Sequence, residues 1–148
     1  MECMLLLIES GGMELVLLRN KEGCTVLHHA AYNGHKAAAR MLIKAGGKKL
    51  LLVTNCDGGS ALHQVAYNGH VESMLQLIKA GVMELVLLKN EEGDTALHQA
   101  ADKGHEAAAR VLVEEGGKEL RFNTGINAAS ALHLAAQNGH EETVRLLR

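Results

Sequence analysis

The chain contains 148 residues, of which 47% are hydrophobic and 22% are charged, and its formal net charge is −2 at pH 7. This composition is close to that of average globular proteins and excludes a chain that stays disordered. The 15 basic and 17 acidic residues are scattered, so no concentrated positive charge is available for nucleic acid or an anionic membrane surface. At this length, one folding unit is the default expectation.

No apolar stretch reaches the ~20 residues that a membrane-spanning helix needs. The apolar segment at residues 4–8 lacks the basic leader and the cleavage site of a signal peptide, so we interpret it as structure. Cys3, Cys24 and Cys56 are odd in number and have no C-x-x-C spacing, which argues against a disulfide framework and against a zinc site. We therefore expect reduced thiols and a location in the cytoplasm or the nucleus.

A leucine followed by a histidine recurs every 35 residues, and a glycine–histidine pair recurs in the same register. Several markers that keep one register indicate an internal repeat. The four copies of the first motif are Leu27-His28, Leu62-His63, Leu97-His98 and Leu132-His133. We divide the single domain, residues 1–148, into a half unit at 1–20, full units at 21–55, 56–90 and 91–125, and a truncated unit at 126–148.

Each unit has the start and stop signals of two short helices. A Thr or Ser stands at the expected N-cap of the first helix, which is about two turns long. The second helix opens after the glycine–histidine pair and is expected to end at a C-terminal glycine. Such short helices cannot bury their faces alone, so neighbouring units must stack. The N-cap residues are Thr25, Ser60, Thr95 and Ser130, and the terminal glycines are Gly46, Gly81 and Gly116.

Residues 23–31 and 93–101 read Gly-Cys-Thr-Val-Leu-His-His-Ala-Ala and Gly-Asp-Thr-Ala-Leu-His-Gln-Ala-Ala, and both resemble the G-x-T-P-L-H-x-A-A core of ankyrin repeats. The resemblance implies an all-α, ankyrin-type solenoid of helix–turn–helix units whose concave face binds protein partners. The sequence departs from the family in its repeat length, which exceeds the usual ~33 residues, and in Ala128, which replaces a glycine. It also lacks the proline, whose position holds Val26, Ala61, Ala96 and Ala131.

The additional residues fall in lengthened linkers between the units, which contain apolar runs at residues 50–53 and 85–88. The family has a β-hairpin finger in this region. We favour a short helical turn for these runs, because a Lys-Lys or Met-Glu pair before a leucine-rich run fits a helical turn better than a strand. Periodicity over so few residues leaves both conformations open.

Nine histidines invite a metal-binding or catalytic hypothesis. Those of the leucine–histidine pairs stand one repeat width apart, too far to share a metal ion with ~2 Å bonds to nitrogen. The resemblance implies that each one hydrogen-bonds near the Thr or Ser of its own unit, and that the histidines after glycine cap neighbouring backbone. We therefore expect His29, which belongs to neither set, to be exposed, and four others to be buried: His28, His63, His98 and His133.

Two pairs place a nucleophile near a histidine in the sequence, Cys24 with His28 and Ser130 with His133. No pocket-forming segment accompanies either pair, and short exposed helices offer no oxyanion donors. We therefore predict that the chain is not an enzyme and needs neither a metal nor a cofactor.

Positions that differ between the units while the frame stays constant are the candidates for binding, because in the ankyrin family they line the concave face. They include Tyr32 and Tyr67, and tyrosine is favoured at binding hot spots. In the alternative interpretation, these rings merely cover the helix of the neighbouring unit. The predicted partner-binding residues are His29, Tyr32, Asn33, Gln64, Tyr67, Asn68, Gln99, Asp102, Lys103 and Gln137. The predicted function is a protein–protein interaction module, and the alternatives are a structural spacer in a longer ankyrin array or an engineered ankyrin binder.

Neither end of the sequence shows a polar capping unit, and the ends of a solenoid need such units to stay soluble. Met4, Leu7 and Ile8 lack a first helix to pack on, and Leu147 lies at the other end. We therefore expect either a segment of a longer array or weak homo-oligomers that form by end-to-end stacking.

Overall fold

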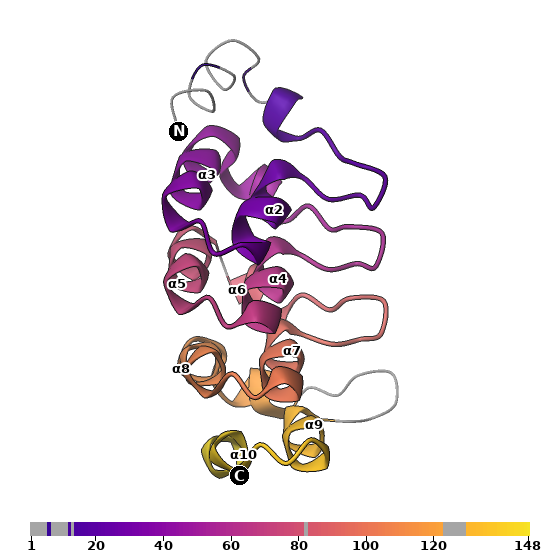
Figure 1. Cartoon of the computed structure of the whole chain (residues 1–148), viewed down its shortest axis with the longest axis vertical. Helices are drawn as coiled ribbons and strands as arrows, with labels where there is room; N and C mark the ends of the chain where they lie inside the picture. The colour runs from indigo at the N-terminus through magenta and orange to yellow at the C-terminus, as the bar shows by residue number, and fades with distance from the viewer. Residues whose placement is uncertain (1–5, 7–11, 13, 82, 123–129) are drawn as a thin grey trace.

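The computed structural model describes residues 6, 12, 14–81, 83–122 and 130–148, and these contain helices but no β-strand. The predicted all-α solenoid is confirmed (Figure 1). The first helices of the units are α2 (Val26–Tyr32), α4 (Ala61–Asn68), α7 (Ala96–Lys103) and α9 (Ala131–Gln137). The second helices are α3 (Lys36–Leu51), α5 (Val71–Ala80), α8 (Glu106–Phe122) and α10 (Glu141–Leu147), and the short α6 (Met83–Leu87) follows α5.

The first and second helices form two parallel columns, and the described fingers project from the column of first helices (Figure 1). Each helix packs on its counterpart in the next unit, as α4 packs on α2 and α7. We call the exposed side of the first helices, together with the fingers at residues 20–24, 55–59 and 90–94, the inner face. The division of the chain into units at the predicted boundaries remains our proposal.

The first helices begin where the sequence predicts. Ser60 is the N-cap of α4, with an extended backbone, and its Oγ accepts a hydrogen bond from the backbone N–H of His63 at 3.4 Å. In return, the His63 ring binds the backbone N–H of Ser60, which satisfies a second free donor at the helix end. Thr25 stands at the same position before α2.

The turn between the two helices of a unit requires glycine. Gly69 has a φ of +71°, in the left-handed region that costs other residues energy. A Cβ at this position would also lie 2.6 Å from Nδ1 of His105 in the next unit. The same conflict exists between Gly34 and His70, so glycine allows both the turn and the close stacking of units.

The second helices do not all end as the sequence predicts. We expected α3 to stop at Gly46, but the helical segment continues to Leu51 across a kink at Gly47, whose φ is +58°. Gly46 has a different role, because a Cβ there would collide with Cβ of Leu50. The bare backbone of Gly46 therefore lets the buried linker leucine pack closely. Gly116 and Gly117 repeat this arrangement in α8.

The favoured helical turn in the linkers is confirmed, by the last turn of α3 after the kink and by α6. A finger still follows each of these turns. Within the second finger, Asn55 N–H donates to Gly59 O at 2.9 Å, and its Oδ1 accepts the N–H groups of Asp57 and Gly59. Neighbouring fingers are joined, since Glu91 N–H donates to Asp57 O at 2.9 Å.

The core consists mainly of leucines and alanines from both columns, including Leu62 and Leu77, which are fully buried. Leu147 is also buried, with 9% of its surface exposed. Met4, Leu7, Ile8 and Ala128 lie outside the described residues, so end-to-end association stays a prediction. Among the described helices, none is long and apolar enough to cross a membrane.

Candidate functional site

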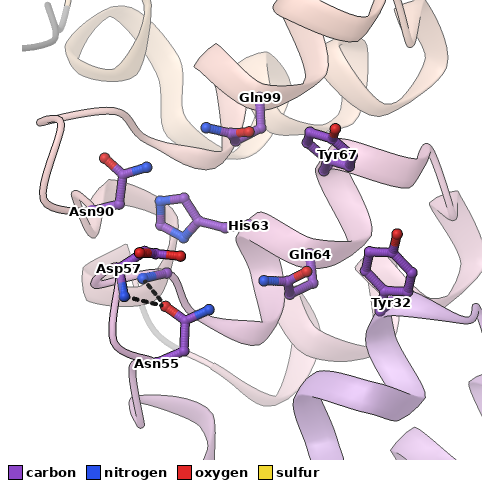
Figure 2. Close-up of a pocket in the computed structure, with 9 residues that line it drawn as sticks. Tyr32, Asn55, Asp57, His63, Gln64, Tyr67, Asn90 and Gln99 are labelled. Atoms are coloured by element: carbon purple, nitrogen blue, oxygen red, sulfur yellow. Dashed lines mark hydrogen bonds between the residues drawn. The ribbon is translucent and has the colours of Figure 1, made fainter. Parts of the chain in front are cut away.

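A hollow of about 290 Å³ lies on the inner face, between the first helices and the second and third fingers (Figure 2). Two tyrosines lie on one side and the finger residues on the other, with histidine and glutamine side chains between them. The lining residues are Tyr32, Asn55, Asp57, Gly59, His63, Gln64, Tyr67, Asn90 and Gln99. Aromatic rings, amides and one carboxylate therefore surround the same space.

Tyr32 and Tyr67 occupy equivalent positions near the C-terminal ends of α2 and α4. Their exposed fractions are 48% and 40%, so neither ring is part of the core. Figure 2 shows the two rings beside each other at the edge of the hollow. Both rings are therefore accessible to another molecule.

The finger side of the hollow consists of Asn55, Asp57 and Asn90, which we did not predict. Asn55 and Asn90 shape their fingers, because Oδ1 of each accepts two backbone N–H groups. The carboxylate of Asp57 has no hydrogen-bond or ion-pair partner among the described residues. A signal for the asparagines was present in the sequence, since Asn20, Asn55 and Asn90 recur at the repeat spacing.

His63 lies in the middle of the hollow, but both of its ring nitrogens are occupied. Nδ1 accepts the backbone N–H of Ser60 at 3.1 Å, so Nε2 carries the proton and donates it to the carbonyl oxygen of Asp94 at 2.9 Å. Burial lowers the pKa of His63 below its ordinary value. Because both ring nitrogens of this neutral imidazole are hydrogen-bonded, His63 connects two units and has no free nitrogen to act as a base.

His28 has the same arrangement, with Nε2 donating to Gly59 O at 3.1 Å. The prediction of burial is correct for His28, His63 and His98, whose exposed fractions are 2%, 4% and 0%. It is wrong for His133, which is exposed although its Nδ1 binds Ser130 in the same way. For His28 and His63 the following finger covers the ring and accepts a hydrogen bond from its Nε2, whereas no finger follows α9 in the described residues.

Three of the histidines after glycine, His70, His105 and His140, cap neighbouring backbone, as the resemblance implied. His70 Nε2 donates to Tyr32 O, and His105 Nε2 donates to Tyr67 O, both at 3.0 Å. His140 makes the equivalent bond to Asp102 O at 2.9 Å. Each bond fixes the end of a first helix, and therefore the place from which the tyrosines project.

Four of the ten predicted partner-binding residues line the hollow: Tyr32, Gln64, Tyr67 and Gln99. Of the others, His29 and Gln137 are exposed. Asn33 turns back to its own helix, where Nδ2 donates to His29 O at 2.9 Å. Whether any of them contacts a partner stays a prediction.

Asn68, Asp102 and Lys103 have contacts within the chain. Asn68 Nδ2 donates to Tyr32 O at 3.0 Å and thereby joins two units. Lys103 Nζ lies 3.4 Å from the Asp102 carboxylate and 4.8 Å from the centre of the Tyr67 ring. The hydrogen bond with Asp102, and then the contact with Tyr67, raise the pKa of Lys103 above its ordinary value.

Neither nucleophile–histidine pair has the geometry of a catalytic site. Ser130 Oγ lies 2.8 Å from His133 Nδ1, but this contact is the helix cap that the other units repeat. Cys24 Sγ has a weak contact from Asn55 Nδ2 at 3.8 Å. No group of three or more His, Cys, Asp or Glu in the described part of the chain is placed to hold a metal ion.

Stacked two-helix units with fingers on one face define a helical repeat protein, and comparison with family models identifies its class. A model for ankyrin repeats in three copies matches residues 48–124 and 85–148, and a model for ankyrin repeats in many copies matches residues 1–43. The chain belongs to the ankyrin-repeat family. A comparison with curated proteins finds no match.

Proposed function

We propose that the chain binds a protein partner on its inner face, with the hollow between the tyrosines and the fingers as the centre of the contact. Ankyrin repeats generally act as protein–protein interaction modules. We take the inner face to be the concave face that the family resemblance implies for binding. The proposal adds the location of the contact and its anchor residues.

The observation that carries the proposal is the exposure of Tyr32 and Tyr67, at 48% and 40%, beside a hollow of about 290 Å³. Tyrosine combines a large apolar area with few rotatable bonds and a polar tip, which favours it at binding hot spots. The hydrogen bonds of His70 and His105 to their carbonyl oxygens fix the backbone beneath both rings. Such a prearranged anchor lowers the entropic cost of binding.

The chemistry of the hollow supports binding better than catalysis. A base needs a free nitrogen within hydrogen-bond reach of its substrate, and both nitrogens of His63 are already bonded. Ankyrin-repeat proteins are generally non-enzymatic interaction modules. The amides of Gln64 and Gln99 provide both donors and acceptors, which suits a polypeptide partner.

Site-specific photo-crosslinking tests the proposal and captures the partner in the same experiment. A crosslinking amino acid is placed at Gln64 or Gln99 on the inner face, and in matched controls at the exposed Lys44 or Lys79 on the second helices. We expect one protein to be trapped from cell extract by the inner-face variants and not by the controls. Trapping of the same proteins from both faces, or none from the inner face, would contradict the proposal and favour a structural spacer.

The trapped partner is then titrated against purified variants by calorimetry. We expect the Tyr32→Ala/Tyr67→Ala variant to lose at least about tenfold in affinity, because truncating a hot-spot residue costs more than ~1 kcal/mol. The Lys44→Ala/Lys79→Ala variant should bind like the wild type. Equal affinities of the tyrosine variant and the wild type would remove the rings from the interface.

A further inference from the structure

One contact within the chain shows how the inner face holds a cation. Lys103 Nζ lies 4.8 Å from the centre of the Tyr67 ring and 3.4 Å from the Asp102 carboxylate. A positive group above an aromatic face is attracted by the ring, and the carboxylate adds a charge of opposite sign. The ammonium group of Lys103 therefore lies between a tyrosine and an acid.

The preceding unit has the tyrosine without the cation. Tyr32 is equivalent to Tyr67, but Asn68 stands where Lys103 stands one unit later. The Asn68 amide donates to the carbonyl oxygens of Tyr32 and Gln64, at 3.0 and 3.4 Å. Within the described residues no lysine or arginine covers the Tyr32 ring. Tyr32 is also the more exposed of the two tyrosines.

The remaining groups of a cation site are present around the same hollow. Asp57 contributes a carboxylate that has no partner in the described part of the chain, and Gln64 lies between Asp57 and Tyr32 (Figure 2). Asp57 supplies the only carboxylate among the residues that line the hollow, and no lysine or arginine lines it. The charge of the hollow is therefore complementary to a positive side chain.

We propose that the hollow binds an arginine side chain of the protein partner, with the guanidinium group on the Tyr32 ring and directed toward Asp57. The inference rests on the proposed function and specifies the chemistry of its partner. Arginine fits better than lysine, because its planar group stacks on aromatic faces and presents five N–H donors. The hollow offers several acceptors for them, in the Asp57 carboxylate and in the amide oxygens of Gln64 and Gln99.

Nuclear magnetic resonance titration tests the site with small probes. The full chain is titrated with Nα-acetyl-arginine amide, with the corresponding lysine amide, and with the citrulline amide, which has nearly the same shape as arginine but no charge. We expect arginine to shift the Tyr32 ring signals and the Gln64 side-chain signals. Citrulline should bind about fivefold more weakly, the loss that one exposed cation–π contact accounts for, and lysine should bind more weakly than arginine.

Variants of the same chain locate the binding. Asp57→Asn should weaken the binding of the arginine probe about fivefold, because it removes the opposite charge. Asn68→Lys adds an ammonium group at the position of Lys103 one unit earlier, beside Tyr32 but without the acid that adjoins Lys103, and it should fill the site from within. Asn68→Leu loses the same amide without adding a charge, so it should weaken binding less than Asn68→Lys. Gln76→Lys adds an equal charge on α5, outside the inner face, and should bind arginine like the wild type.

Several outcomes would overturn the inference: equal shifts with arginine and citrulline, equal binding of arginine and lysine, or undiminished binding to Asn68→Lys. Thermal unfolding of each variant separates a lost site from a lost fold. The crosslinking experiment gives an independent result. Inner-face crosslinks without arginine binding would overturn the arginine site alone, whereas their absence would overturn the proposed function itself.

Discussion

The second and the last units of the chain contain the same motif in different surroundings. Ser60 and His63, at the start of α4, are buried, with 0% and 4% of their surfaces exposed. Ser130 is half-buried and His133 is exposed at the start of α9. The local hydrogen bonds are nevertheless alike, because each histidine Nδ1 accepts the serine backbone N–H, at 3.1 and 3.2 Å. The motif forms its own turn, but its burial depends on another unit.

The difference between the two units is one covering finger. His63 Nε2 donates to Asp94 O in the third finger, whereas His133 has no equivalent acceptor in the described residues. In a solenoid, the stability is approximately the sum of the intrinsic terms of the units and the interface terms between neighbours. His133 should therefore contribute only a local term to the free energy of unfolding. His63, at the equivalent position, should contribute a local term and an interface term.

The largest expected effect comes from removing this histidine. His63→Ala leaves the buried Ser60 N–H without a partner, and an unsatisfied buried group costs about 1–3 kcal/mol. It also removes one of the two hydrogen bonds to the Asp94 carbonyl and leaves a cavity under the third finger. We expect a loss of about 3 kcal/mol in the free energy of unfolding. His133→Ala should lose less than about 1 kcal/mol, since water reaches the freed groups. Urea unfolding measures both, and similar losses would refute the interface term.

Glycines that follow the first helices allow a second comparison of the same kind. Gly69 and Gly139 both have positive φ, +71° and +74°, so alanine costs about 1–2 kcal/mol at either position. A Cβ at Gly69 would also lie 2.6 Å from the His105 ring, which is bonded to Tyr67 O, whereas nothing lies within 4 Å at Gly139.

We therefore expect Gly69→Ala to reduce the free energy of unfolding by about 1–2 kcal/mol more than Gly139→Ala does, the usual cost of overpacking. The two variants share the backbone strain, so their difference isolates the contact with the next unit. Thermal unfolding followed by circular dichroism is sufficient to measure it. An equal loss in both variants would show that the His105 ring moves aside without cost.

The sequence predicts those features of the fold that each unit specifies for itself. The N-caps, the helical linker turns and the exposure of His29 follow from local residue types and were predicted correctly. The kink of α3 was not, because Gly46 and Gly47 are both glycine and the pattern does not indicate which one takes positive φ. Gly47 takes the positive φ, and Gly46 has a different constraint, because Leu50 packs where a Cβ of Gly46 would lie.

The candidate site was predicted only in part, for a related reason. Variation between the units indicated the helix side of the hollow, including Tyr32 and Gln99. The finger side was missed because Asn55 and Asn90 are constant between units, and we regarded only variable positions as candidates. An acid recurs at the repeat spacing, as Glu22, Asp57 and Glu92, but the finger turn and its backbone bonds decide that Asp57 reaches the hollow.

The smallest expected effect concerns pH and depends on the covered histidines. Burial lowers the pKa values of His28 and His63, although the hydrogen bonds to Gly59 and Asp94 partly oppose this. The unfolded chain, with histidine pKa values of about 6.5, binds protons more readily than the folded one. The stabilising contribution is therefore fully present above about pH 6.5 and is lost as the pH falls through the lower folded values.

We expect the free energy of unfolding to decrease between pH 7.5 and pH 5.5, by at most about 1.4 kcal/mol over the whole range for each of the two histidines. Most carboxylates stay ionised in this range, so they contribute little. Urea unfolding at several pH values gives the slope, and nuclear magnetic resonance titration of the His28 and His63 rings gives their pKa values independently. Those values, inserted in the linkage relation, must reproduce the measured loss. A stability that is constant or rises as the pH falls would mean that the covered imidazoles accept protons as readily as exposed ones, and that the finger over His63 gives it little protection.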